Sequence, residues 1–459
     1  MGRSRATGSG IAAAFAGALL LLVLFLAGVG SRAAEVSAHG FVGVASCAGT
    51  TCHGRSEGDG KIVRQDELMR WQDPASPAGI HSRAFRALAE PRARAIAARL
   101  GIGEATGAPM CLGCHATPTA AAAAAGPRFL RSDGVGCEAC HGAASDWLAS
   151  HYSVGASHAA NVARGMVPLD DPRARAAKCL DCHYGSAAPG QFVDHRLMAA
   201  GHPRLSFELD LFTTLQQHHV EDADYVQRKG KRSTVQVWAI GQALALERSL
   251  ALYATPKGTN GVFPEFYFFD CHTCHRAISD DRRFQPSAAA NPGRPIPSGM
   301  PAYNDENMIM LAAALRATQP ALAARFEHDS RAFHAGLAED RGSALAAAAR
   351  LRTTAVAVAD QFERGGVTRA QTFAIIDAIA SGAVAARFTD YEGSVQAVMA
   401  VDTLLSALVN AGQVDAAAAK AIRGDIETAY RAVREPNAYD PREFRSGLGR
   451  AAAAIRRLA

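Results

Sequence analysis

Ten cysteines fall into five close pairs in this chain of 459 residues, and a histidine follows each pair directly. The pairs are Cys47 and Cys52, Cys111 and Cys114, Cys137 and Cys140, Cys179 and Cys182, and Cys271 and Cys274. The histidines that follow them are His53, His115, His141, His183 and His275. Five such adjacencies have a chance probability on the order of 10⁻⁷, so the spacing indicates a chemical requirement.

Covalent haem attachment explains both the spacing and the histidines. Two thiols add to the vinyl groups along one edge of a porphyrin, and the histidine that follows the second cysteine binds the iron on the proximal side of the ring. A zinc site needs four ligands around one ion, and a redox dithiol does not need this histidine. Disulfides would not require it either. The sequence therefore predicts five covalently bound haem c groups.

The first motif, "CAGTTCH", holds four residues between its cysteines where the other four hold two. These residues, Ala48 to Thr51, are small, so they can bulge outward while both thiols keep their places. Taken alone this motif would be a weak match. Beside four regular motifs, and with no other partner for its thiols, it is interpreted as a fifth haem site.

The elements that carry these motifs are expected to be short. Cys47 to His275 provide only about 46 residues for each haem, so the macrocycles must supply much of the core. Segments such as "GVGCEACHG" hold too few large apolar residues to fold alone, and we expect the chain without haem not to fold. Strand signals are nearly absent. The predicted class is mainly α, with a multihaem unit of short helices and loops.

A proline- and glycine-rich stretch, residues 285–301, is predicted to be a linker between two units. Residues 39–284 would form the pentahaem unit before it. Residues 302–459 contain no cysteine and run in alanine-rich patterns of helical period, which predicts a helical bundle. This bundle could shield haem edges or form a surface for a partner, and the sequence does not decide between these roles.

Residues 1–38 are expected to direct export. Arg3 and Arg5 precede the uncharged run from Ile11 to Val29, and the small residues Ser31 and Ala33 frame a cleavage site. The run is also long enough to anchor the chain in a membrane uncleaved. Either way the rest of the chain would be periplasmic in a bacterium. The formal net charge of +5 includes three arginines of this segment, which leaves too little to predict nucleic-acid binding.

The stretch from Trp71 to His151, "W…HSRAFRAL…CLGCHATP…GVGCEACHGAASDWLASH", resembles the cytochrome c-554-like family of multihaem c-type cytochromes. The stretch "CLDCHYGS…VDHRLMAAGHPRLSFEL…FPEFYFFDCHTCH" resembles its pentahaem relatives, and the likeness runs from about Val42 to Ile278. The resemblance implies distal iron ligands at His81, His151, His195, His202 and His219. Six further histidines stay in reserve: His39, His158, His218, His272, His328 and His334.

Five haems in one short stretch predict an electron-transfer protein, in which mostly bis-histidine irons pass electrons between redox partners. Partners would be other redox proteins or membrane complexes that oxidise quinol. The alternative is an oxidoreductase that acts on a small nitrogen or sulfur compound at one five-coordinate haem. A ligand sensor or an assembly scaffold is the third class. No catalytic residue stands out, so whether the protein is an enzyme is left open.

Overall fold

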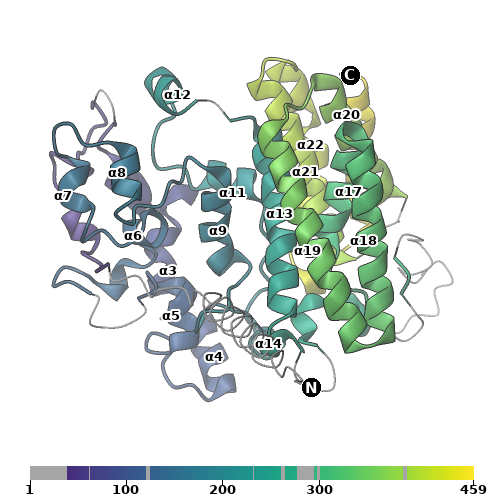
Figure 1. Ribbon diagram of the computed structural model, residues 1–459, viewed down its shortest axis with the longest axis horizontal. Coiled ribbons are helices and arrows are strands. Elements are labelled where there is room, and N and C mark those ends of the chain that lie inside the picture. Colours follow the sequence, from purple (N-terminus) through teal and green to yellow (C-terminus); the bar gives the residue numbers. More distant parts are fainter. Residues whose placement is uncertain are drawn as a thin grey trace, which may run out of the picture.

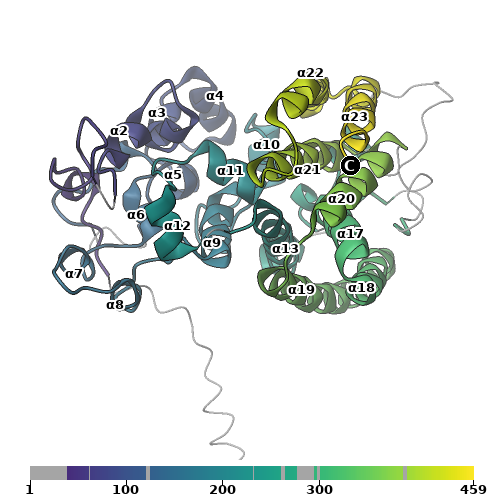
Figure 2. The same cartoon turned by 90° about the horizontal axis from the view of Figure 1, so that it is seen from above.

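The computed structural model describes residues 39–60, 63–119, 125–230, 232–259, 264–275, 294–296, 300–385 and 390–459. The expected export signal, residues 1–38, lies outside them. Figures 1 and 2 show two regions side by side: short helices and long loops in one, and a bundle of long helices in the other. The described residues contain no strand, only the isolated bridges Phe41–Ala125 and Phe269–Tyr303. The predicted mainly α class is therefore confirmed.

The first region, here called the haem-motif region (residues 39–230), is built from helices of four to twelve residues joined by loops. Its α-helices are α2 (Glu67–Gln72), α3 (Ala84–Ala87), α4 (Pro91–Leu100), α5 (Pro109–His115), α6 (Cys137–His141), α7 (Leu148–His151), α8 (His158–Val162), α9 (Pro172–His183), α10 (His195–Ala199), α11 (Leu209–Leu215) and α12 (Ala223–Lys229).

Local sequence explains where these short helices begin and end. Proline opens α4, α5 and α9, where its fixed φ suits the first turn and its missing N–H is not needed. The Asp171 carboxylate accepts the Arg173 N–H at 2.9 Å and caps α9. Gly101 ends α4 with φ +67°, a left-handed conformation that glycine adopts without strain.

The second region, here called the helical bundle, consists of long helices. They are α13 (Thr234–Tyr253), α17 (Glu306–Thr318), α18 (Pro320–Glu339), α19 (Arg341–Arg364), α20 (Arg369–Val384), α21 (Tyr391–Asn410), α22 (Ala416–Ala432) and α23 (Pro441–Arg456). Helix α19 packs along both α13 and α18, and α22 packs along α23. Two short α-helices, α14 (Pro256–Thr259) and α15 (Cys271–Cys274), lie between α13 and α17 in the chain, with the 3₁₀ helix η6 (Phe266–Phe268) between them.

The packing does not follow the linker expected at residues 285–301. Helix α13 precedes that linker, yet its residues Trp238 and Leu246 are buried in the same core as Leu351 of α19. Arg294 falls inside the linker and is also buried, paired with Asp305 and Asp390. The bundle thus includes a helix that we had assigned to the pentahaem unit.

Helix α21 lies at the centre of the bundle. By length and composition it could cross a membrane, but 89% of that segment is buried inside the structure. Burial on all sides is typical of the central helix of a large bundle. Its apolar character therefore needs no membrane to explain it.

Candidate haem-binding sites

Four of the five motifs lie on helices, at the end of α5, along α6, at the end of α9 and on α15. The first motif instead forms a tight turn after the 3₁₀ helix η1 (Val44–Ser46), in which Cys52 and Gly54 both donate N–H bonds to the Gly49 carbonyl. His53 donates its N–H to the Cys47 carbonyl at 3.2 Å. The longer loop is thus folded back on itself, which brings Cys47 close to His53. We number the sites 1 to 5 in chain order.

A second imidazole faces the histidine of every motif. The ring centres are 6.2 Å apart for His53 and His151, 6.1 Å for His183 and His81, and 6.4 Å for His115 and His202. They are 6.3 Å apart for His141 and His218, and 6.0 Å for His275 and His195. Each pair joins residues that are far apart in the chain.

These separations fit an iron held between two imidazoles. Two metal–nitrogen bonds of about 2 Å, plus roughly 1 Å from each nitrogen to its ring centre, add up to about 6 Å. Direct ring stacking would bring the centres closer, and unrelated rings would not repeat one distance five times. The residues present therefore fit an iron porphyrin at each site, attached through the two cysteines. None of the ten cysteines forms a disulfide.

Hydrogen bonds orient several of these rings. Nδ1 of His53 lies 3.0 Å from the Glu67 carboxylate, and Nδ1 of His115 lies 2.9 Å from the Ala84 carbonyl. Nδ1 of His202 lies 2.7 Å from the Pro203 carbonyl. When Nδ1 donates to an acceptor in this way, the proton is fixed there and Nε2 keeps a free lone pair for a metal.

Burial keeps the central histidines neutral. It lowers the pKa of His141 to about 3, and that of His183 and His218 to about 4. Burial also lowers the pKa of His81, His151 and His202. A neutral imidazole is the form that binds a metal, so these surroundings suit ligation at neutral pH.

The family resemblance implied His219 as a distal ligand, whereas the structure places its neighbour His218 opposite the motif histidine His141. The His219 ring lies 5.6 Å from that of His218, and its Nε2 is 3.6 Å from the Glu221 carboxylate. The segment that follows α11 turns so that only the first histidine of the pair points to His141. Nothing in the sequence "QHHV" distinguishes the two, because the choice depends on where α11 ends.

Thiols of different motifs lie close together. Cys47 of site 1 and Cys137 of site 3 are near enough to shift each other's pKa, and so are Cys114 of site 2 and Cys182 of site 4. Cys182 of site 4 lies close enough to Cys140 of site 3 to help raise the pKa of the Cys140 thiol. Sites 2 and 5 take His202 and His195 from one short segment around α10. The five sites are therefore neighbours in the order 1, 3, 4, 2, 5.

A buried carboxylate joins sites 1 and 3. Glu138 lies between the cysteines of the third motif, and its two oxygens accept N–H bonds from Val42 at 2.9 Å, Gly43 at 2.8 Å and Ala144 at 2.8 Å. Gly43 has φ +85° and its α-carbon passes so near Arg128 that a side chain would collide with the backbone. Glu138 thus anchors the chain immediately before the first motif onto the helix of the third.

Site 5 lies against the helical bundle. Nε2 of His272, between the cysteines of the fifth motif, is 2.8 Å from the Pro436 carbonyl, which precedes α23. Arg204, two residues after His202, forms a buried ion pair with Glu392 of α21 and donates to the Tyr267 carbonyl at 2.9 Å. The guanidinium of Arg204 is therefore directed into the bundle.

The three tryptophans have packing roles. Trp71, Trp147 and Trp238 are all buried, and Trp238 lies in the bundle core. Trp147 also packs edge-on against His151, with ring centres 5.7 Å apart. It therefore supports the imidazole that faces the first motif.

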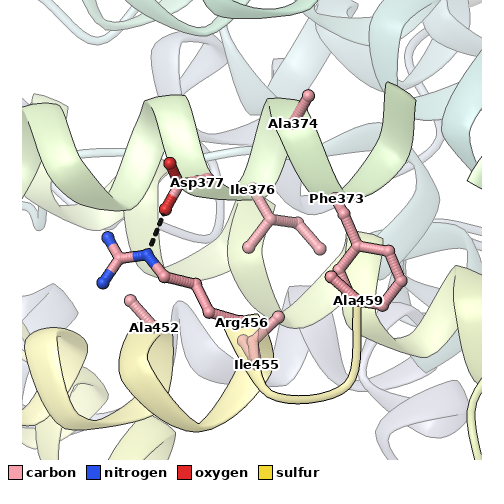
Figure 3. A pocket seen from close by; sticks show the side chains of 8 residues that line it. All are labelled: Phe373, Ala374, Ile376, Asp377, Ala452, Ile455, Arg456 and Ala459. Atoms are coloured by element: carbon pink, nitrogen blue, oxygen red, sulfur yellow. Dashed lines mark hydrogen bonds and ion pairs between the residues drawn. The ribbon is translucent and has the colours of Figure 1, made fainter. Parts of the chain in front are cut away.

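Figure 3 shows an apolar pocket of about 250 Å³ between α20 and α23. Phe373, Ile376 and Ile455 line it, together with Arg456 and Asp377, which form an ion pair. It lies on the side of the bundle away from the haem-motif region (Figure 2) and contains no residue of the five sites.

Comparison with known proteins gives one match. Residues 46–142, which span the first three motifs, match the family model described as cytochrome c554 and c-prime. Searches of curated proteins and of solved structures found no match.

Proposed function

We propose that the whole chain is a pentahaem electron-transfer protein, because residues 46–142 match the family model of cytochrome c554 and c-prime and the same kind of motif recurs twice beyond them. All ten cysteines would attach haem. The motif histidines and the five histidines opposite them would be the axial ligands, with His218 in place of His219.

The repeated ring separation carries this proposal. With a partner imidazole near 6 Å from each motif histidine, both axial positions of every iron would be filled. A closed, low-spin iron changes its surroundings little on reduction, which favours electron transfer over substrate binding. The haem supplies the redox chemistry, and the chain holds the rings, excludes water and sets the order of the sites.

The order of the sites supports a single conducting path. The nearby thiols make 1 and 3, 3 and 4, and 4 and 2 neighbours, and the segment around α10 links 2 to 5. Sites 1 and 5 would then be the two ends. Each end has an exposed attachment cysteine, Cys52 at site 1 and Cys274 at site 5. Electrons would enter at one end and leave at the other.

We further propose that the protein works in the periplasm, either free or held at the membrane by residues 1–38. Its partners there would be other redox proteins or a membrane complex that oxidises quinol. The competing proposal is an oxidoreductase with one open iron that reacts with a small nitrogen or sulfur compound. It needs a motif histidine with no imidazole opposite, and each of the five has one.

A total haem count, combined with an electron paramagnetic resonance spectrum of the ferric protein, tests the proposal. We expect five haems, all low-spin. The facing rings are nearly parallel at sites 1 and 5 and steeply inclined at sites 2, 3 and 4, so two classes of low-spin signal should appear. One quantified high-spin haem would instead support the oxidoreductase.

Two matched variants test the ligand assignment at site 3. His218→Met should change one low-spin signal and raise the potential of one haem, because methionine ligation favours the ferrous state. His219→Met should leave both unchanged. The reverse result would return the assignment to His219.

A further inference from the structure

A group of ionisable side chains is buried between site 5 and the helical bundle. None of them is an axial ligand or an attachment cysteine. We call them the buried charge cluster. Its members are Arg204, Arg294, Asp305, Glu306, Asp390, Glu392 and His334. They come from the segment after α10, the chain before α17, the starts of α17 and α21, and the middle of α18.

Arg204 connects this cluster to site 5. Its guanidinium pairs with Glu392, lies 4.7 Å from the centre of the Tyr267 ring, and is close enough to Cys271 to lower the pKa of that thiol. The Glu392 carboxylate also acts on the ionisation of Cys271. The haem attached through Cys271 would therefore lie directly beside the cluster.

The second guanidinium, that of Arg294, already pairs with two carboxylates. Arg294 donates to Asp305 at 2.5 Å and to Asp390 at 2.9 Å. His334 Nε2 lies 3.4 Å from Asp305, and burial lowers the pKa of His334 to about 3, so this ring stays neutral. The cluster thus holds two positive charges, on Arg204 and Arg294. Each guanidinium is already paired with carboxylates other than that of Glu306.

Four carboxylates share those two charges, and Glu306 is the one that forms no ion pair with either guanidinium. Its side chain is buried and its Oε2 has no hydrogen bond. Burial raises the pKa of Glu306 to about 7, and repulsion from Glu392 adds to this against the attraction of Arg204. The other groups around it are the carboxylate of Asp390 and the buried hydroxyls of Tyr184, Tyr267 and Tyr303, whose pKa values burial raises.

A buried group with excess negative charge around it responds to any nearby change of charge, because little water screens it. When site 5 gains an electron, one positive charge is lost beside Arg204 and Cys271. The ionised form of Glu306 becomes less favourable, and the neutral acid more so.

We propose that Glu306 is a proton-binding site whose occupancy is coupled to the redox state of the haem at site 5. This inference rests on the proposed electron-transfer function. Glu306 takes one proton from solvent when one electron arrives from the preceding haem, and returns the proton when the electron leaves for the partner. The electron transfer at this end of the path then depends on pH.

Spectroelectrochemical titration of the full holoprotein between pH 5.5 and pH 8.5 tests this coupling. The potential of one haem should fall as pH rises, by up to about 59 mV per unit, the value for one proton per electron. His195→Met identifies that haem, since it should raise the potential of site 5 alone. Glu306→Gln should abolish the slope at site 5, and Glu427→Gln, at an exposed position of α22, should keep it.

Two results would overturn the coupling. The first is a reduction potential of site 5 that does not change with pH in the wild-type protein. The second is a pH dependence that persists in Glu306→Gln, which would assign the proton to another group. If the Glu306→Gln protein does not accumulate, Glu306→Asp is the variant to test. A displaced carboxylate should shift the pH at which the site 5 potential begins to fall. Five low-spin haems without any slope would leave the electron-transfer function intact.

Discussion

The haem-motif region and the helical bundle are stabilised in opposite ways. In the bundle, one continuous core runs through all the long helices, with residues such as Phe326, Leu351 and Val398 fully buried. The haem-motif region has only small apolar clusters outside that core. One groups Ile96, Leu100, Val193, Leu197 and Ala200, and the other groups Leu88, Ala97 and Ala105.

The difference shows what each region needs in order to fold. A large apolar core can stabilise a bundle without cofactors, whereas small clusters cannot offset the entropy of ordering long loops. In the haem-motif region the covalent macrocycles must provide the missing apolar surface. From the sequence we expected the whole chain not to fold without haem. The structure leads us to expect this only of residues 39–230.

Production of the full chain without haem attachment should give the largest effect. We expect proteases to cleave within residues 39–230 while the bundle stays protected, and the helical circular dichroism signal to be reduced but not lost. Limited proteolysis with mass spectrometry locates the cuts. Protection of both regions would show that the haem-motif region does not depend on haem.

Truncation of the bundle core should produce the next largest effect. Leu351 is fully buried in α19, so Leu351→Ala should lower the free energy of unfolding by about 2–5 kcal/mol. Thermal or denaturant unfolding measures this loss, with the exposed Arg350→Ala as control. The low-spin haem signals should be unchanged in the folded variant. Altered haem spectra would mean that the two regions are stabilised together.

Glu138→Gln should have the smallest effect and should be confined to the haem-motif region. The amide offers one acceptor oxygen where the carboxylate used two, and its NH₂ group would face the N–H of Gly43. We expect a loss of about 1–3 kcal/mol and a weaker magnetic interaction between the haems of sites 1 and 3.

Electron paramagnetic resonance and thermal unfolding, with the exposed Glu57→Gln as the matched control, check both effects of Glu138→Gln. An unchanged interaction would show that Glu138 does not position the first motif against the third.

Much of the site was predictable from the sequence because haem attachment is local. Two thiols and a histidine within five to seven residues are sufficient to hold one edge and one face of a porphyrin. For this reason the ten cysteines and the five motif histidines could be named directly, including those of "CAGTTCH". The helical period of residues 302–459 likewise predicted the bundle, since the pattern of apolar residues sets the buried face.

The imidazole that lies opposite each motif histidine could be identified only from the tertiary structure. His81 and His183, or His53 and His151, are far apart in the sequence, and the fold alone brings each pair to about 6 Å. The choice of His218 over His219 depends on the end of α11, and the inclusion of α13 in the bundle depends on the partners of its buried side chains. Local chemistry is encoded in adjacent residues, whereas pairing across the chain depends on how the whole molecule packs.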